Sequence, residues 1–405
     1  TYSNSATSWI NGFSNYWAPS KTMANPDLKW ETTITRNLGL DFTVLGGKLN
    51  GTIEAYLNTT TDLLIQFPVG GTGYDTQYRN MGKTENKGIE ASINWTIVNK
   101  KDWGVSFNAN IGFNKNTIKD LGMMNDFGAE TYWASSEIGN DFWIAKGGSV
   151  GQMYGYRSDG RYEASDFVGY DAATDSWILK EGVVDASAVV GKIRPGSMKL
   201  KNIDGSEDNK VTTDDREIIG DANPLHTGGF GISAYAYGFD LSANFNWSFG
   251  NDVYNANKIE FTQTGKYQYR NMTSEMADGK RWTNLRADGT LSTDLEELAA
   301  MNANTTMWSP LTDRMIFSDW AVEDGSFLRL NTLTLGYTLP KSLLSKVKIQ
   351  NLRFYVTGYN LFCLTSYTGY DPEVSTIRKT NLTPGVDYSA YPKSRQFVVG
   401  VNLNF

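Results

Sequence analysis

A twelve-residue stretch from Asp204 to Asp215 carries the side chains whose types and spacing best fit a chemical task. It reads DGSEDNKVTTDD, with oxygen-bearing side chains at positions 1, 3, 5, 9 and 12. This spacing is typical of a loop that surrounds Ca²⁺ with oxygen ligands. The candidate metal ligands are Asp204, Ser206, Asp208, the backbone carbonyl of Lys210, Thr212 and Asp215.

The stretch departs from the EF-hand pattern at three positions. Ser206 stands where Asp or Asn is usual, Asn209 stands where glycine is usual, and Asp215 replaces the longer Glu. The flanking segments IRPGSMKLKNI and REIIG predict a turn, a strand and a short connection, and do not predict two helices. We therefore expect an isolated, dockerin-like loop at 204–215 with calcium in a structural role. An acidic, solvated turn without metal is the alternative.

The sequence offers no constellation for catalysis. His226 is the only histidine and Cys363 the only cysteine, so neither a nucleophile paired with histidine nor a zinc-binding cluster is indicated. The protein is predicted not to be an enzyme. The segment DLEELAA, 294–300, predicts one short amphipathic helix with a solvated acidic face.

Aromatic residues crowd one long segment of the chain, where they would either stack against sugars or pack the segment internally. They are Trp133, Trp143, Tyr154, Tyr156, Tyr162, Tyr170 and Trp177. Residue types alone do not choose between these two roles, so the substrate-binding residues are left unassigned.

Composition narrows the class of protein. The formal net charge is -7 and no Lys/Arg-rich run occurs, so a nucleic acid is excluded as the expected partner. Forty Gly, 22 Tyr, 19 Phe and 12 Trp indicate a turn-rich β-protein. No run of about 18 apolar residues occurs, so no transmembrane helix is predicted.

Several segments alternate apolar and small polar residues with a period of two, as membrane-spanning β-strands do. GIEASINWTI from Gly88 and WGVSFNANIGF from Trp103 predict a hairpin, and LSANFNWSF and FVVGVNLNF repeat the pattern. The polar face carries Ser, Asn and Thr and is largely uncharged, which favours a wet lumen over a solvated sheet. Short turns at 45–48, 98–102 and 237–240 alternate with the long polar segments 114–227 and 251–325, which is typical of outer-membrane barrels.

A set of motifs in order along the chain resembles the barrel of SusC/RagA-type TonB-dependent transporters of Bacteroidetes. The set includes NPDLKWETT (25–33), NMGKTENKGIEASINW, MYGYRSDGRY (153–162), IIGDANPLHTGGF (218–230), FLRLNTLTLGYTLP (327–340), VTGYNLFCLTSYTGYDPEV (356–374) and the closing YPKSRQFVVGVNLNF. The resemblance implies an all-β fold: the C-terminal half of a transmembrane antiparallel β-barrel of about 22 strands, with short periplasmic turns and long extracellular loops.

The resemblance also implies how the chain is divided. The whole of 1–405 is expected to be a partial barrel, with 114–227 as a long extracellular loop that holds the calcium motif. The plug and the N-terminal domains of the family are expected to be absent. The start TYSNSATSWINGF lacks a Met and an apolar leader, which predicts a processed form or a fragment.

The function implied by the resemblance is uptake of an oligosaccharide or oligopeptide through the cell outer membrane. The expected partners are a SusD-like lipoprotein lid, the TonB complex and outer-membrane lipid. Two alternatives stay open: a SusC-like barrel that serves an assembly or secretion complex, and a soluble, secreted, calcium-stapled β-protein.

Overall fold

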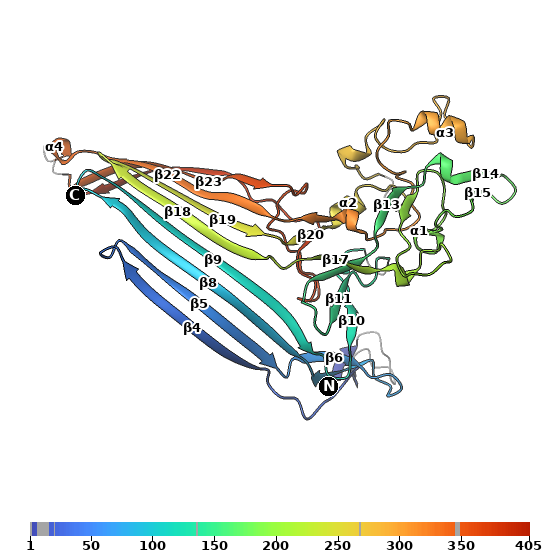
Figure 1. Cartoon of the computed structure of the whole chain (residues 1–405), viewed down its shortest axis with the longest axis horizontal. Coiled ribbons are helices and arrows are strands. Elements are labelled where there is room, and N and C mark those ends of the chain that lie inside the picture. Colours follow the sequence, from blue (N-terminus) through green and yellow to red (C-terminus); the bar gives the residue numbers. More distant parts are fainter. Residues whose placement is uncertain (1, 6–15, 20, 135–136, 267–268, 345–348) are drawn as a thin grey trace.

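The structure is a computed structural model that describes residues 2–5, 16–19, 21–134, 137–266, 269–344 and 349–405. The expectation drawn from residues 1–13 falls mostly outside these ranges. A long sheet occupies one side of the molecule, and a group of shorter elements gathers at one end of it (Figure 1).

Nine antiparallel strands form the sheet, in the order β25-β23-β22-β19-β18-β9-β8-β5-β4. Within the described residues β4 and β25 each pair with one neighbour only, so the sheet has two open edges. The strands are β4 (Thr32–Val44), β5 (Leu49–Thr61), β8 (Lys83–Asn99), β9 (Trp103–Asp120), β18 (His226–Ala236), β19 (Phe239–Phe249), β22 (Phe327–Thr338), β23 (Asn351–Thr365) and β25 (Gln396–Asn404).

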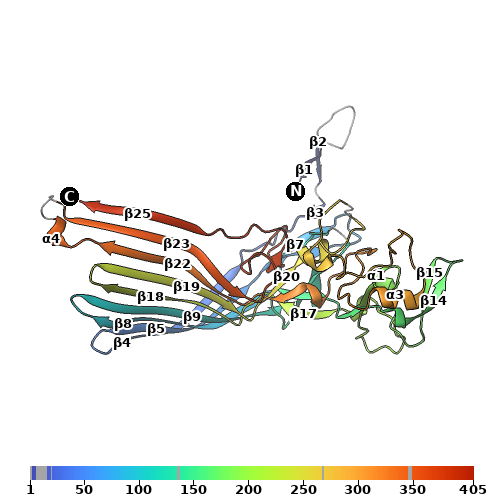
Figure 2. The same cartoon turned by 90° about the horizontal axis from the view of Figure 1, so that it is seen from above.

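Connections differ in length at the two ends of the sheet, as expected from the sequence. At one end, the turn end, β4 and β5, β8 and β9, and β18 and β19 are joined by tight turns (Figure 2). Tyr237 and Gly238 both have positive φ, which is the geometry of a two-residue hairpin whose twist matches that of its strands. The opposite end, the loop end, carries all the long connections.

The two faces of the sheet differ in chemistry because side chains alternate along each strand. One face holds Ile89, Phe113 and their neighbours at every second position, and many of these apolar side chains are exposed. The other face is a ladder of cross-strand hydrogen bonds between small polar side chains. These bonds join Thr52 to Ser92 (2.7 Å), Asn116 to Asn86 (2.9 Å), Asn244 to Thr332 (3.0 Å) and Thr334 to Thr357 (2.9 Å). The polarity of the two faces confirms the barrel-wall prediction.

Glycines on the polar face make room for tyrosine rings on neighbouring strands. A Cβ added at Gly88 would lie 2.5 Å from the ring of Tyr56, and one at Gly400 would lie 2.3 Å from the ring of Tyr355. Each ring therefore lies flat across its glycine and packs without a side chain between it and the backbone. The Tyr56 hydroxyl then donates to Asn114 Oδ1 at 2.9 Å.

The strand around Phe113 is longer than its apolar alternation indicates. Apolar alternation weakens beyond Phe113, yet β9 continues to Asp120 and stays paired with β8. Backbone hydrogen bonds continue past the level at which the outward side chains stop being apolar. The connection to β18 therefore spans 121–225 in the structure.

The segments at the loop end fold together into one body, which we call the cap: the described residues of 62–82, 121–225, 250–326 and 366–395. Its helices are α1 (Ser187–Val190), α2 (Ala256–Glu260) and α3 (Leu295–Met301), while α4 (Lys341–Leu344) lies at the turn end. Its strands are β6 (Leu64–Pro68), β7 (Thr76–Asn80), β10 (Asp126–Ala129), β11 (Phe142–Ala145), β12 (Gln152–Gly155), β13 (Ser158–Arg161), β14 (Phe167–Asp171), β15 (Ser176–Leu179), β16 (Met198–Leu200), β17 (Glu217–Asp221), β20 (Asp252–Asn255), β21 (Val322–Asp324) and β24 (Val386–Asp387). Three strands near the N-terminus are β1 (Tyr2–Ser5), β2 (Tyr16–Pro19) and β3 (Thr22–Met23).

One of the hydrophobic clusters of the cap ties three of the long connections together. Tyr254 is fully buried at its centre, accepts a hydrogen bond from Trp133 Nε1 (2.6 Å) and stacks on Phe317 at 3.8 Å between ring centroids. Val386, from the last connection, joins the same cluster. The cap is thus packed around buried hydrophobic side chains, a feature that the expectation of a long extracellular loop at 114–227 did not include.

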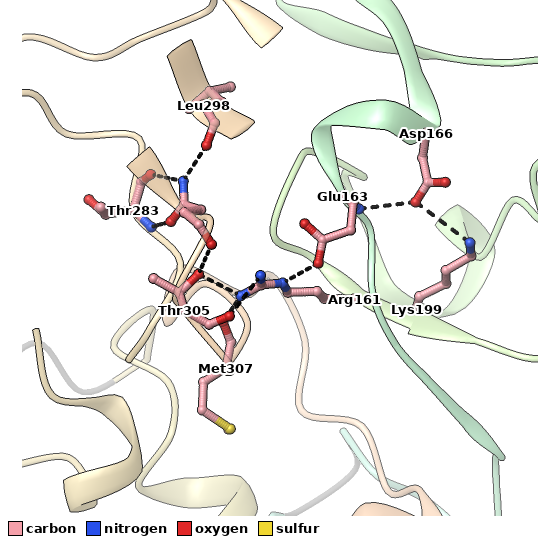
Figure 3. A network of polar contacts seen from close by, with 9 residues as sticks. Arg161, Glu163, Asp166, Lys199, Thr283, Leu298, Thr305 and Met307 are labelled. Atoms are coloured by element: carbon pink, nitrogen blue, oxygen red, sulfur yellow. Dashed lines mark hydrogen bonds and ion pairs between the residues drawn. The ribbon is translucent and has the colours of Figure 1, made fainter. Parts of the chain in front are cut away.

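A polar network joins the cap segment 121–225 to the segment 250–326 (Figure 3). Arg161 pairs with Glu163 at 2.7 Å and donates to the carbonyl oxygens of Thr305 (3.0 Å) and Met307 (2.7 Å). The predicted helix at 294–300 is confirmed as α3, whose N-cap Asp294 accepts from the Glu297 amide at 2.8 Å.

Candidate functional site

Two adjoining hollows open at the loop end between the sheet and the cap. The first has a volume of about 790 Å³. Its polar lining comes from the sheet and from the segments around Ser149 and Asp221, and includes Tyr56, Asn114, Asn116, Ser149, Asp221 and Asn223. The rest of the lining is apolar or basic, and comprises Leu57, Lys87, Gly88, Ile89, Phe113, Lys115, Pro224 and Leu225. The hollow therefore combines hydrogen-bonding groups and positive charge with an apolar surface.

The second hollow, of about 840 Å³, shares Asn116 with the first and lies against β6, β10 and the segment 379–382. Its walls mix apolar side chains such as Ile118 with the polar groups of Gln66 and Asn140. The lining is drawn from segments up to about 300 residues apart, because Gln66 and Lys379 both contribute to it. No local pattern in the sequence predicted this site.

Tyr132 is the most unusual residue of the second hollow. Its φ is +60°, in the left-handed region that a tyrosine rarely adopts, and its side chain is 38% exposed. Arg378 donates to its carbonyl oxygen at 2.8 Å, and Lys379 Nζ lies 4.0 Å from the centre of its ring. A residue stays in such a strained backbone conformation only where surrounding contacts hold it there, and strained residues are concentrated at binding and active sites. We therefore regard Tyr132 as the best single candidate for ligand contact.

The aromatic residues singled out from the sequence divide into three groups in the structure. Trp133 is buried in one hydrophobic cluster of the cap and Tyr156 and Tyr162 are buried in a second, so none of the three is available for stacking against a ligand. Trp143 packs on Tyr154 at 4.7 Å, and Arg216 covers the Tyr154 ring. Tyr170 and Trp177 lie together on the hairpin of β14 and β15, where both are part-exposed.

The predicted calcium loop is ordered by its own hydrogen bonds. Asp208 Oδ1 accepts from Ser206 Oγ (2.9 Å) and from the Lys210 amide (3.0 Å), and Asp204 Oδ1 accepts from the Ser206 amide (2.7 Å). Asn209 has a φ of +54°, the left-handed conformation expected at the position where EF-hand loops carry glycine. The oxygens of Asp204, Ser206 and Asp208 therefore gather on one exposed stretch of the loop.

Asp215 has a different environment from the other candidate ligands. Its carboxylate is fully buried, and it accepts backbone hydrogen bonds from Ile203 (2.6 Å), Asp204 (3.1 Å) and Thr212 (2.7 Å). Thr212 Oγ1 caps the short helix Thr213–Asp215 by accepting from the Asp214 amide. Across the described residues, no three His, Cys, Asp or Glu side chains converge closely enough to hold a metal. Calcium binding stays a prediction.

Calcium is expected to protect the loop 204–215 from proteolysis, with half-protection between about 0.1 and 1 mM, the range of weak extracellular sites. The Asp204→Ala, Asp208→Ala double variant removes two ligand carboxylates and should lose this protection. Cleavage rates measured with calcium and with a chelator test the expectation. Equal rates in both conditions for the wild-type protein would leave the loop as a metal-free turn.

Asp141 is a buried carboxyl group in the cap core. Thr131 donates to it twice, from its amide (2.9 Å) and from its hydroxyl (2.5 Å). Burial nevertheless raises the pKa of Asp141 from its ordinary value near 4 to about 7, and only partial compensation comes from these bonds and from the charge of Arg216. The folded state therefore binds the Asp141 proton more tightly than the unfolded state does. The protonated Asp141 carboxyl contributes its full share to the free energy of unfolding below pH 4, and this share is lost as the pH rises through 7.

The Asp141→Asn variant should make the cap less sensitive to pH. Asparagine stays neutral, so at pH 8 the variant should exceed the wild type in cap stability by on the order of 2–4 kcal/mol, and near pH 4 the two should match. Thermal unfolding followed by tryptophan fluorescence at both pH values measures the difference. An equal difference at both pH values would contradict the assigned pKa.

His226 lies on the apolar face of the sheet, beside Phe113 and Leu225 of the first hollow. Its Nδ1 accepts from Trp247 Nε1 at 3.0 Å, and its ring stacks on Phe249 at 5.1 Å. The histidine is thus one member of an aromatic cluster at the loop end of the apolar face.

Comparisons with known proteins agree with this architecture. Residues 1–192 match the family described as TonB dependent receptor-like, beta-barrel. TonB-dependent receptor P3 of Formosa agariphila is 30% identical over 387 residues, which cover 94% of this chain and 35% of that protein. TonB-dependent receptor SusC of Bacteroides thetaiotaomicron is 28% identical over 395 residues, which cover 96% of this chain and 34% of that protein.

Solved structures give the same result. The RagAB peptide importer in its closed-closed state superposes with a TM-score of 0.71 at 25% identity, over 100% of this chain and 38% of that chain. The chain is part of the β-barrel of a TonB-dependent receptor, a family of outer-membrane proteins, and is similar to SusC and RagAB. It spans about a third of the length of the relatives it matches. None of the helices in the described part of the chain is long and apolar enough to cross a membrane.

This assignment orients the sheet. In outer-membrane barrels the polar face lines the lumen, the apolar face meets lipid, the long loops are extracellular and the short turns are periplasmic, and we infer the same orientation for this sheet and its cap.

Proposed function

We propose that the complete receptor imports an oligopeptide or oligosaccharide across the outer membrane. In this proposal a SusD-like lipoprotein closes over the cap, and the TonB complex supplies the energy for release into the periplasm. The paired hollows at the extracellular mouth, with the strained Tyr132 in one of them, are the observation that carries it. Similarity to the RagAB importer, whose cargo is a peptide, supports the same class of cargo here.

The chemistry of the hollows fits either class of substrate. Asn114 offers an amide donor, which pairs equally well with peptide groups and with sugar hydroxyls. Asn116 and Asn223 already hydrogen-bond to Asn86, Val150 and Asp221, and they shape the hollow. Lys379 and Arg378 add positive charge beside Tyr132, so an acidic or carboxylate-bearing substrate gains a favourable interaction.

Uptake by cells that express the complete receptor tests the proposal. Labelled peptide mixtures and labelled oligosaccharides are offered separately, with and without a functional TonB. The Tyr132→Ala variant should raise the KM for the transported class by about tenfold or more, since it removes a preorganised contact. Tyr269→Ala is the matched control, because Tyr269 is 100% exposed and lies outside both hollows. Uptake that is independent of TonB for both classes would refute the proposal.

A role in an assembly or secretion complex is the second candidate function. The large folded cap is the observation that favours this role, because such a domain can also bind a protein partner. The proteins that co-purify with the receptor separate the two: a SusD-like lipoprotein supports import, and a set of secretion components supports the alternative. The soluble, secreted alternative is disfavoured by the match to a family of membrane barrels.

A further inference from the structure

Three cations lie in one row on the lipid-facing surface of the barrel wall. Strand register places Arg36 of β4 beside Leu57 of β5, Leu57 beside Lys87 of β8, and Lys87 beside Lys115 of β9. All of these share the face of Ile89, the next outward residue after Lys87 on β8. Arg36, Lys87 and Lys115 are exposed.

The row stands at the extracellular border of the apolar band. On β8 the outward side chains from Trp95 to Ile89 are apolar or alanine, and Lys87 is the first charge. Trp95 and Lys87 are eight residues apart, or about 26 Å along a strand. With the usual tilt this is about 20 Å of height, close to the roughly 25 Å apolar band of such barrels. The lysines therefore lie at the level of the outer-leaflet headgroups.

Aromatic residues at the same level support this placement. Phe113 is the outward residue next to Lys115 on β9, and its ring centre lies 5.6 Å from that of His226. His226 continues the cluster to Phe249 and Trp247. Aromatic clusters of this kind mark the interface between hydrocarbon and headgroups.

No protein anion neutralises the row within the described part of the chain. Arg36, Lys87 and Lys115 make no ion pair or side-chain hydrogen bond there, and the outward carboxylate Glu85 is paired with Lys119 at 3.0 Å. Asp221 lines the same hollow as the two lysines, but its carboxylate accepts from Ser149 (2.7 Å) and from the Asn223 amide (2.9 Å) and forms no ion pair with them. Lys87 and Lys115 are direct cross-strand partners, an arrangement in which like charges destabilise a sheet. An anion bound between them removes that repulsion.

We propose that Lys87, Lys115 and Arg36 form a binding site for the phosphate of an anionic outer-leaflet lipid. The two lysines hold the phosphate between β8 and β9, and Arg36 reaches it from the next hairpin. Below them Ile89 and Phe113, 54% and 46% exposed, offer an apolar surface to the acyl chains. A cationic side chain on the lipid-facing surface destabilises a barrel little at the height of the headgroups. Each Lys or Arg near a negatively charged membrane surface also strengthens the attraction between the protein and its anionic lipids.

The test uses the complete receptor, delipidated in a neutral detergent. Phosphatidylglycerol and phosphatidylcholine are added separately, and bound lipid is counted by native mass spectrometry and by the rise in melting temperature. The Lys87→Gln, Lys115→Gln double variant should bind phosphatidylglycerol about 30-fold more weakly, which corresponds to about 2 kcal/mol for two cations. Lys87→Arg with Lys115→Arg should restore binding, because it keeps both charges.

Two controls make the result decisive. Lys180→Gln with Lys201→Gln removes two exposed cap lysines and should leave lipid binding unchanged. In lipid-free detergent the Lys87→Gln, Lys115→Gln variant should be at least as stable as the wild type, since a like-charge pair is removed. Equal binding of phosphatidylglycerol by the wild type and this variant would overturn the proposal. A wild-type shift produced equally by inorganic phosphate would assign the site to a free anion, and capture of an acidic protein in place of lipid would overturn it as well.

Discussion

Replacing Arg329 with methionine should release the segment 366–395 from the barrel wall while the sheet stays folded. Arg329 lies on β22, faces the lumen and is 4% exposed. Its Nη2 donates to Asp371 Oδ1 at 2.6 Å, and its Nε lies 2.7 Å from Glu373 Oε2. Lys393 closes the cluster by donating to Glu373 Oε2 at 2.6 Å. Arg329 thus holds the start of the connection between β23 and β25, and Lys393 joins the end of that connection to the same carboxylates.

The Arg329→Met substitution should greatly destabilise the docking of segment 366–395, because the carboxylates that pair with Arg329 are largely buried in the docked state. Removing one member of a buried ion pair leaves an uncompensated charge and costs about 3–5 kcal/mol. Asp371 is itself buried, so the segment gains by moving its carboxylate into water. Hydrogen exchange across 366–395 should accelerate by a factor of about 10² to 10³, since about 1.4 kcal/mol corresponds to a factor of ten.

Arg353→Met is the matched control. Arg353 also faces the lumen and pairs with Asp240 through two contacts of 2.9 and 2.5 Å, but it lies near the turn end. Its loss should leave exchange in 366–395 unchanged. If both variants accelerate exchange equally, the effect comes from a general loosening of the barrel and the role assigned to Arg329 is wrong.

Replacing Asp215 with alanine should unfold the loop 203–215 whether or not calcium is present. The variant removes the acceptor of three backbone N–H groups, those of Ile203, Asp204 and Thr212. Each buried donor left without a partner costs about 1–3 kcal/mol, so a local loss of about 3–5 kcal/mol remains after some relaxation. Val211, a residue of this loop that is fully buried in the cap, should become exposed as the loop opens.

Proteolysis and hydrogen exchange of 203–215 in the complete receptor measure this loss. Asp215→Asn keeps the shape and one carbonyl acceptor, so its effect should be smaller than that of Asp215→Ala. Asp214→Ala is the control, because Asp214 is exposed and its side chain accepts no hydrogen bond in the described structure. If Asp215→Ala behaves like wild type without calcium and fails only to bind it, the carboxylate acts as a metal ligand alone.

The placement of Asp215 bears on the calcium hypothesis. Position 12 of an EF-hand loop normally gives both oxygens to the metal, whereas here both oxygens are occupied by the loop's own amides. Calcium, where it binds, would rely on Asp204, Ser206, Asp208 and the Lys210 carbonyl. The two experiments on this loop therefore report on different residues and different forces.

Much of the barrel wall was determined by the sequence itself. Alternation around Ile89, Phe113 and Trp247 specifies strands with one apolar face, because a period of two is a property of the extended backbone. The tight turn at Tyr237 and Gly238 is local as well, and so is the helix capped by Asp294. Each of these features depends on residues within a few positions of one another.

Only the tertiary structure decided the cap, the hollows and the row of cations. Trp133 meets Tyr254 and Gln66 shares a hollow with Lys379 through contacts between distant segments, which no local period encodes. Lys87 and Lys115 become neighbours only through the register of β8 and β9, since a shift of one residue would turn one of them into the lumen. The sequence determined which side chains face lipid and which face water. Pairing and packing decided which of them meet.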